Sequence, residues 1–231
     1  EINGHDFDTK QRNLSYTVNL PYNESEKITD DQPPKFHDDS LVTVKRLDIE
    51  TIELTWDAAV DNTQVDKYVI LKNGQYHKTV YVDFWNEEIA NRQFKAEITK
   101  LSYDKDYDYE VIAIDAWANE STPIQVKLPS ISQIGWIPIN TTWYYIDPET
   151  KELATRWLFL KGEWYFFNND GKMRIGWLSE GPVSYYLTND GTLAKGWSAI
   201  DHEWYHFSTK TGVMTTGWLV EENKKYYLNE D

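Results

Sequence analysis

The sequence predicts an all-β chain in which a β-sandwich is followed by a solenoid of about five β-hairpins. Two observations carry this prediction. Residues 33–129 contain short runs of alternating apolar and polar residues, separated by turn signals every 8 to 12 residues or so, as is typical of a sandwich. From Trp136 onward, tryptophan recurs at intervals of 20 or 21 residues, which indicates an internal repeat over residues 130–231.

The composition of the 231 residues excludes several kinds of protein. The absence of cysteine rules out a disulfide scaffold, a thiolate metal site and a cysteine nucleophile. The formal net charge of -15 disfavours binding to nucleic acid or to anionic lipid, and it favours neutral or cationic ligands. No apolar run is long enough to cross a membrane.

Residues 1–32 are predicted to be the trailing strand of an upstream module and a linker. The alternation at residues 14–20 indicates one strand, and a single strand has no independent fold. Pro33 and Pro34 stiffen the entry to the next part. The chain opens on Glu1 without a signal peptide, so we expect it to be a fragment of a longer protein.

The predicted sandwich has a recognisable order of core residues. Its clearest strand patterns lie at residues 52–56, 68–71 and 109–114. Trp56 ends the first of these runs, and Leu101 stands six residues before Tyr107. This order resembles a bacterial fibronectin type III domain. The resemblance implies that Trp56 lies in the core, that the Tyr107 hydroxyl caps backbone near Leu101, and that the domain serves as a spacer.

The last 101 residues hold eight of the 11 tryptophans in a fixed order. The first tryptophan of each repeat is Trp136, Trp157, Trp177, Trp197 or Trp218. Seven residues later come Trp143, Trp164, Ser184, Trp204 and Lys225, each followed by tyrosine. Glycine turns that suit tight hairpins separate the repeats. Because a hairpin of about 20 residues cannot bury its own face, the hairpins must stack.

Stacking brings aromatic rings of adjacent hairpins together around small crevices. We expect two indole walls from one hairpin, a phenol wall from the next, and a leucine or methionine floor. Such a box suits a quaternary ammonium ion, and each wall contributes roughly 0.5 to 2 kcal/mol. Three walls give about millimolar affinity. Several sites on one polymer raise the avidity by about 10² to 10⁴.

The repeat pattern of Gly-Trp, a spacer, Trp-Tyr-Tyr and a glycine turn closely resembles the choline-binding or cell-wall-binding repeat of Gram-positive bacteria and their phages. The resemblance implies three choline sites, each made of two tryptophans and a tyrosine of the following repeat. They are Trp136, Trp143 and Tyr165; Trp157, Trp164 and Tyr185; Trp197, Trp204 and Tyr226. Met173 and Leu193 are expected floor residues. The third wall is alternatively the next aromatic residue, Phe166, Tyr186 or Tyr227.

Some repeats depart from this pattern. Ser184 and Lys225 remove one wall from the third and fifth repeats, so we expect three complete sites. Arg156 replaces the usual glycine before Trp157, and Lys151 stands where later turns have glycine.

Two stretches partly match the sequence patterns of metal sites. Residues 202–206 match the zinc-protease pattern HExxH, but the repeat places them in a strand, where residues four apart are separated by about 13 Å and cannot share a zinc ion. Asp104, Asp106 and Asp108 lack the spacing of a calcium loop. We predict no catalytic residue, no metal and no cofactor.

The sequence therefore predicts a non-catalytic, C-terminal cell-wall-targeting region. The resemblance implies an extracellular protein held non-covalently on choline-decorated teichoic or lipoteichoic acid, commonly part of a cell-wall hydrolase or surface glycosidase, and a choline-linked homodimer. No nucleic-acid partner and no membrane insertion are expected. One alternative is a glucan-binding repeat of an extracellular enzyme or toxin. Another is a structural stalk whose aromatic residues only pack the hairpins together.

Overall fold

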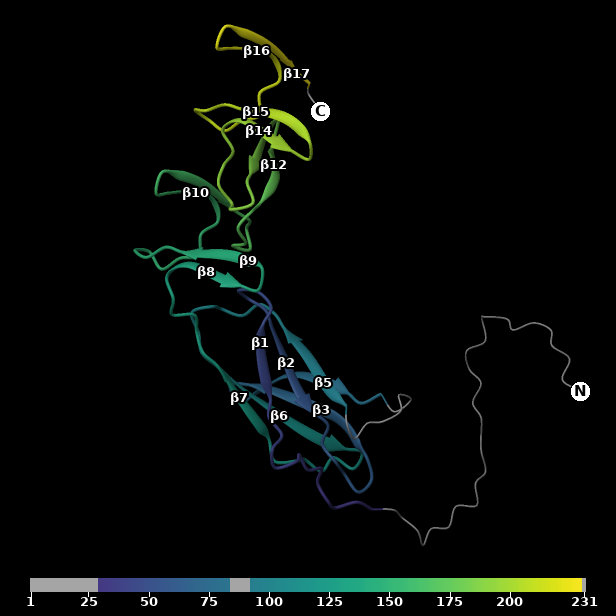
Figure 1. The fold of residues 1–231 in the computed structure, drawn as a ribbon. Coiled ribbons are helices and arrows are strands. Elements are labelled where there is room, and N and C mark those ends of the chain that lie inside the picture. Colours follow the sequence, from purple (N-terminus) through teal and green to yellow (C-terminus); the bar gives the residue numbers. More distant parts are fainter. Residues whose placement is uncertain (1–28, 84–91, 230–231) are drawn as a thin grey trace, which may run out of the picture.

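The computed structural model of the chain describes residues 29–83 and 92–229, which form strands and no helix (Figure 1). The all-β prediction is confirmed for this part of the chain. The strand expected at residues 14–20 lies outside the described residues. Among the described residues, no helix has the length and hydropathy needed to span a bilayer.

Residues 29–83 and 92–129 form two antiparallel sheets packed on one core. The first sheet has the strand order β1 (Thr43–Arg46), β2 (Ile52–Asp57) and β5 (Gln93–Ile98). The second has the order β4 (Gln75–Tyr81), β3 (Val65–Lys72), β6 (Tyr107–Asp115) and β7 (Ile124–Leu128). Buried and exposed residues alternate along β2 and β5, because one face of each strand meets the core.

Two expectations about this core are confirmed. Trp56 is only 1% exposed, and its ring stacks on Phe94 and meets Tyr68 edge-on. The Tyr107 hydroxyl accepts a hydrogen bond of 2.9 Å from the backbone N–H of Ser102, the residue after Leu101. The hydroxyl cap therefore fixes the loop that leads into β6.

Five hairpins follow the sandwich, and each is a separate two-stranded antiparallel sheet. They are β8 (Gly135–Ile139) with β9 (Thr142–Ile146), β10 (Arg156–Leu160) with β11 (Glu163–Phe167), β12 (Gly176–Glu180) with β13 (Val183–Leu187), β14 (Gly196–Ile200) with β15 (Glu203–Phe207), and β16 (Gly217–Glu221) with β17 (Lys224–Leu228). Figure 1 shows them leading away from the sandwich one after another toward the C-terminus. The predicted number and placement of the hairpins are confirmed.

The segment after each hairpin ties that hairpin to the one before it. Met173 forms a β-bridge with Phe167 of its own hairpin, and its N–H donates to the carbonyl of Trp143 in the preceding one at 2.8 Å. Leu193 repeats this arrangement one hairpin later, with the carbonyl of Trp164 as acceptor at 2.9 Å. The expected floor residues are therefore held by backbone hydrogen bonds directly beside the second tryptophans.

The turns between hairpins need left-handed backbone. Gly191 has a φ of 84°, and a Cβ on it would overlap the side chain of Met173, so glycine is required both for conformation and for space. Lys151 and Arg156 stand at positions where other repeats have glycine, and they still take φ values of 63° and 64°. The repeat geometry therefore overrides the local preference of these two residues.

The first hairpin is packed directly against the end of the sandwich. Ile49, in the loop between β1 and β2, is buried in a cluster with Ile137, Ile139, Tyr144 and Ile146 of the first hairpin. Tyr103, Ile131 and Leu153 pack around this cluster. A shared apolar core fixes the position of the solenoid on the sandwich.

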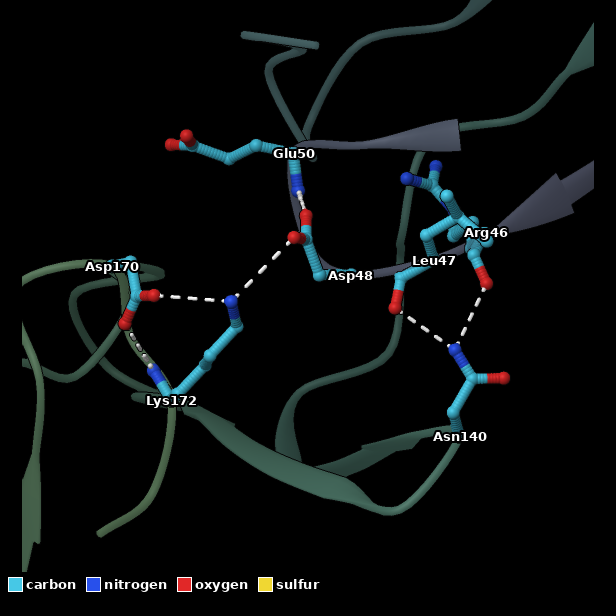
Figure 2. A network of polar contacts seen from close by, with 7 residues as sticks. All are labelled: Arg46, Leu47, Asp48, Glu50, Asn140, Asp170 and Lys172. Carbon is cyan, nitrogen blue, oxygen red and sulfur yellow. Dashed lines mark hydrogen bonds and ion pairs between the residues drawn. The ribbon is translucent and has the colours of Figure 1, made fainter. Parts of the chain in front are cut away.

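A polar network surrounds this shared core (Figure 2). The side-chain amide of Asn140, in the turn of the first hairpin, donates to the carbonyls of Arg46 and Leu47 at 3.3 and 2.8 Å. Lys172 lies 3.6 Å from Asp48 of the sandwich and 3.2 Å from Asp170. Lys172 immediately precedes the floor residue Met173, so the network reaches from the sandwich to the second interhairpin turn.

Candidate functional site

The first aromatic hollow lies between the first two hairpins and has a volume of about 370 Å³. Trp136 on β8 and Trp143 on β9 stand nearly perpendicular, at 87°, with ring centroids 6.3 Å apart. Tyr165 on β11 lies 5.0 Å from Trp136. Met173 also lines the hollow. Because the rings meet at steep angles and do not stack flat, they leave an open corner with three aromatic sides.

The second hollow repeats this geometry one hairpin later, with a volume of about 250 Å³. Trp157 and Trp164 stand at 85° with centroids 6.4 Å apart, and Tyr185 lies 5.0 Å from Trp157. Leu193 occupies the position that Met173 has in the first hollow. The structure thus brings together both expected sets of residues.

The third expected set is assembled less completely. Trp197 lies 4.8 Å from Tyr226, as in the other two sets. Trp204, however, is 66% exposed, compared with 44% for Trp143 and 38% for Trp164. In the first two hollows, a turn that lies two hairpins further along the chain also lines the site. The described residues end at position 229, before the position that such a turn would occupy for Trp204.

The structure gives the alternative third-wall residues a different place. Each lies opposite the first tryptophan of its own hairpin in the strand register. Their ring centroids are 5.1 to 5.2 Å from those tryptophans, in the pairs Phe166 with Trp157, Tyr186 with Trp177, and Tyr227 with Trp218. These rings pair with the first tryptophan of their own hairpin, whereas Tyr165, Tyr185 and Tyr226 face the first tryptophan of the preceding one.

Polar residues that the sequence reasoning missed complete both hollows. Asn189 and Asp190, from the turn after β13, line the first hollow, and Thr211 lines the second. Hydrogen bonds from the hydroxyls of Thr188 and Thr192 lower the pKa of the Asp190 carboxyl below its ordinary value. Burial, with the charge of Asp190, raises the pKa of Tyr165. The first hollow therefore carries a negative charge beside a neutral phenol.

Two further carboxylates hold the first tryptophans of the other two sets. Glu180, at the end of β12, accepts a hydrogen bond of 2.7 Å from Nε1 of Trp157. Glu221, at the end of β16, accepts one of the same length from Nε1 of Trp197. Aligning the repeats would have located both residues, since each follows a first tryptophan by three positions. Aligning the repeats does not identify Asp190, because its contact with the first hollow depends on the rotation between successive hairpins.

The remaining two first tryptophans lack a second indole. Trp177 packs between Tyr186, Tyr205 and Phe207, and Ser184 stands where the other repeats have the second wall. Trp218 is largely exposed, and Lys225 occupies its second position. The structure therefore assigns no three-ring hollow to these two tryptophans within its described residues.

Residues 202–206, which match the zinc-protease pattern, have an extended backbone in most of their length. Glu203 to His206 belong to β15, and His202 lies in the turn before it. His206 is buried, and its Nδ1 is 3.0 Å from the Thr215 hydroxyl. In its strand it takes the position that holds an aromatic residue in the other repeats, with its ring 5.2 Å from Trp197. These contacts make His206 a packing residue.

Comparisons with known families match the repeats and not the sandwich. Residues 194–231 match a family model described as "Choline-binding repeat". Residues 134–149 and 155–173 match one described as "Putative cell wall binding repeat". No curated protein sequence matches the chain significantly.

Several solved structures are similar to this chain. One is CbpJ from Streptococcus pneumoniae TIGR4, at 20% identity and a TM-score of 0.42, covering 76% of this chain and 61% of CbpJ. Another is choline binding protein F from Streptococcus pneumoniae, at 19% identity and a TM-score of 0.41, covering 78% and 68%. A third is a pneumococcal cell wall endolysin from phage Cp-1 complexed with choline, at 26% identity and a TM-score of 0.37, covering 45% and 32%. The chain thus spans less than two thirds of the length of CbpJ and about a third of the endolysin.

Proposed function

Since residues 134–149, 155–173 and 194–231 match choline-binding and cell wall binding repeats, we propose that this chain is a cell-wall-targeting region that binds choline groups of teichoic acids through its aromatic hollows. The binding residues are Trp136, Trp143, Tyr165 and Met173 in the first site, Trp157, Trp164, Tyr185 and Leu193 in the second, and Trp197, Trp204 and Tyr226 in the third. The region works outside the cell and is non-covalently attached to the wall.

The perpendicular placement of two indoles beside a phenol is the observation that carries this proposal. A trimethylated nitrogen has no hydrogen-bond donor, so it is recognised by aromatic faces within about 6 Å. A flat stack of rings would offer one face only. Three rings around an open corner offer several faces at once, and the methyl groups can then pack on the Met173 or Leu193 floor.

The proposal gives the sandwich the role of a spacer. We assign residues 33–129 to a fibronectin type III domain, which the hydroxyl cap of Tyr107 and the buried Trp56 support. Residues 1–32 belong to an upstream module and linker, and a cell-wall hydrolase or glycosidase is the activity that such a region would direct. Because Ile49 and Asn140 join the sandwich to the first hairpin, the spacer is rigid at its C-terminal end.

Carbohydrate binding is the second candidate, because Asn189, Asp190 and Thr211 place hydrogen-bonding groups at the rims of the hollows. Calorimetric titration of the chain separates the candidates. We expect choline to bind the two complete hollows with about millimolar affinity and the third site more weakly. Binding of dextran without choline would support the carbohydrate candidate. Binding of neither ligand would leave a purely structural stalk.

A further inference from the structure

Each of the three two-tryptophan groups has a carboxylate, and that carboxylate comes from another hairpin. Asp190 lines the hollow of Trp136 and Trp143. Glu180 accepts the indole hydrogen bond of Trp157, and Glu221 accepts that of Trp197, both at 2.7 Å. Asp190 comes from a turn, whereas Glu180 and Glu221 stand at the ends of strands. The three carboxylates therefore do not occupy one repeated position of the hairpin.

The hairpin framework does not need the two glutamates. The position three residues after the first tryptophan is apolar in the other repeats, where it holds Ile139, Leu160 and Ile200. The two repeats with glutamate there, at Glu180 and Glu221, are also the two that lack a second tryptophan. Each of these two repeats therefore lacks a two-tryptophan site of its own, and its glutamate binds the first tryptophan of the repeat before it.

Electrostatics makes these groups selective. A carboxylate that accepts a hydrogen bond from an indole N–H increases the electron density of the ring and fixes its orientation. The same negative charge attracts a cation bound over the ring, and it does nothing comparable for a neutral molecule of equal shape. Aromatic walls alone discriminate less, because they also accept sugars and alkyl groups.

We propose that Asp190, Glu180 and Glu221 are specificity-determining residues that make the three two-tryptophan sites select a quaternary ammonium cation over a neutral ligand of the same shape. This inference rests on the proposed choline binding and adds the residues that set its charge selectivity.

The groups around each carboxylate indicate how much that carboxylate contributes to choline selectivity. Both hydroxyl hydrogen bonds to Asp190 end on Oδ1, so Oδ2 accepts none from the described residues. Glu180 also lies 3.3 Å from the guanidinium of Arg156, which offsets part of its charge. Gly196 occupies the position of Arg156 in the fourth repeat, so Glu221 has no guanidinium partner at that position, and it lies 3.9 Å from Nε2 of His206. We therefore expect Asp190 and Glu221 to contribute more than Glu180.

The test compares choline with 3,3-dimethylbutan-1-ol, its neutral isostere with carbon in place of nitrogen. The chain is titrated with each ligand while the indole N–H resonances of Trp136, Trp157 and Trp197 report the three sites separately. Asp190→Asn should weaken choline binding at Trp136 about threefold to tenfold and leave binding of the isostere within about twofold. Glu180→Gln and Glu221→Gln should do the same at Trp157 and Trp197.

A control and a second variant keep the result interpretable. Asp201→Asn removes an exposed carboxylate in the turn between β14 and β15, and it should change neither ligand's affinity. Glu180→Leu introduces the side chain that the second repeat carries naturally as Leu160, and it removes both the charge and the acceptor of the Trp157 hydrogen bond. It should weaken choline binding at Trp157 at least as much as Glu180→Gln does.

The outcomes separate this inference from the proposed function. If the unsubstituted chain binds choline but the three carboxylate variants bind it equally well, the inference is wrong and the proposed function stands. The inference is equally wrong if the substitutions weaken binding of choline and of the isostere together. If the unsubstituted chain binds neither ligand, the proposed function fails, and this inference fails with it.

Discussion

Replacing Trp164 with alanine is expected to remove the second choline site without unfolding the chain. Trp164 is 38% exposed and forms one wall of the hollow, while Trp157 and Tyr185 remain packed together. Losing one wall costs roughly 0.5 to 2 kcal/mol, which weakens an already millimolar site by about twofold to thirtyfold, and at the upper end the site is no longer filled in the titration. Calorimetric titration with choline should therefore show one site fewer at an unchanged affinity of the first site.

Trp218→Ala is the matched control for this experiment. Trp218 is a largely exposed tryptophan of the fifth hairpin, and Lys225 stands where its partner indole would be. The control should keep the full number of choline sites. Full retention of the sites in Trp164→Ala, or an equal loss in both variants, would count against the assignment of the second hollow.

Replacing Phe207 with alanine should cause a large loss of stability in the solenoid. Phe207 is 0% exposed, lies between Trp177 and Tyr186, and belongs to a cluster with Ala194 and Ile200. A buried phenylalanine-to-alanine change typically lowers the free energy of unfolding by about 3 to 5 kcal/mol. Because the backbone hydrogen bonds that tie the hairpins together join neighbouring hairpins, the last two hairpins should unfold separately from the first two.

Denaturant unfolding followed by tryptophan fluorescence measures this effect. Phe159→Ala, at a phenylalanine that is 52% exposed on β10, is the control, and it should lower the free energy of unfolding by less than about 1 kcal/mol. Choline binding in the first hollow should survive at denaturant concentrations that unfold the fourth and fifth hairpins of Phe207→Ala. A single unfolding transition with wild-type stability would contradict the stacking argument.

The repeat part of the fold could be predicted because its signal is periodic. Trp136, Trp157 and Trp177 mark equivalent positions of successive hairpins, and a short hairpin cannot bury these rings without a neighbour. The two-residue period of a strand places the second tryptophan and the tyrosine that follows it on opposite faces, so this tyrosine can face the preceding hairpin. These local rules suffice to bring the rings of the first two hollows together.

Other parts of the site depend on geometry that the sequence does not encode locally. Asp190 reaches a hollow formed two hairpins earlier, and only the rotation between stacked hairpins determines that contact. Ile49 is one apolar residue in a loop, and no pattern marks it as the centre of the junction with the first hairpin. Lys151 also adopts a left-handed conformation that its residue type disfavours, because the neighbouring repeats fix the turn.

A crystal structure of this chain grown with choline decides whether the aromatic hollows bind choline. We expect a trimethylammonium group in the corner between Trp136, Trp143 and Tyr165, with its nitrogen within about 6 Å of all three ring centroids, and a second one between Trp157, Trp164 and Tyr185. Choline bound elsewhere on the surface, with both hollows closed by their own side chains, would contradict this expectation.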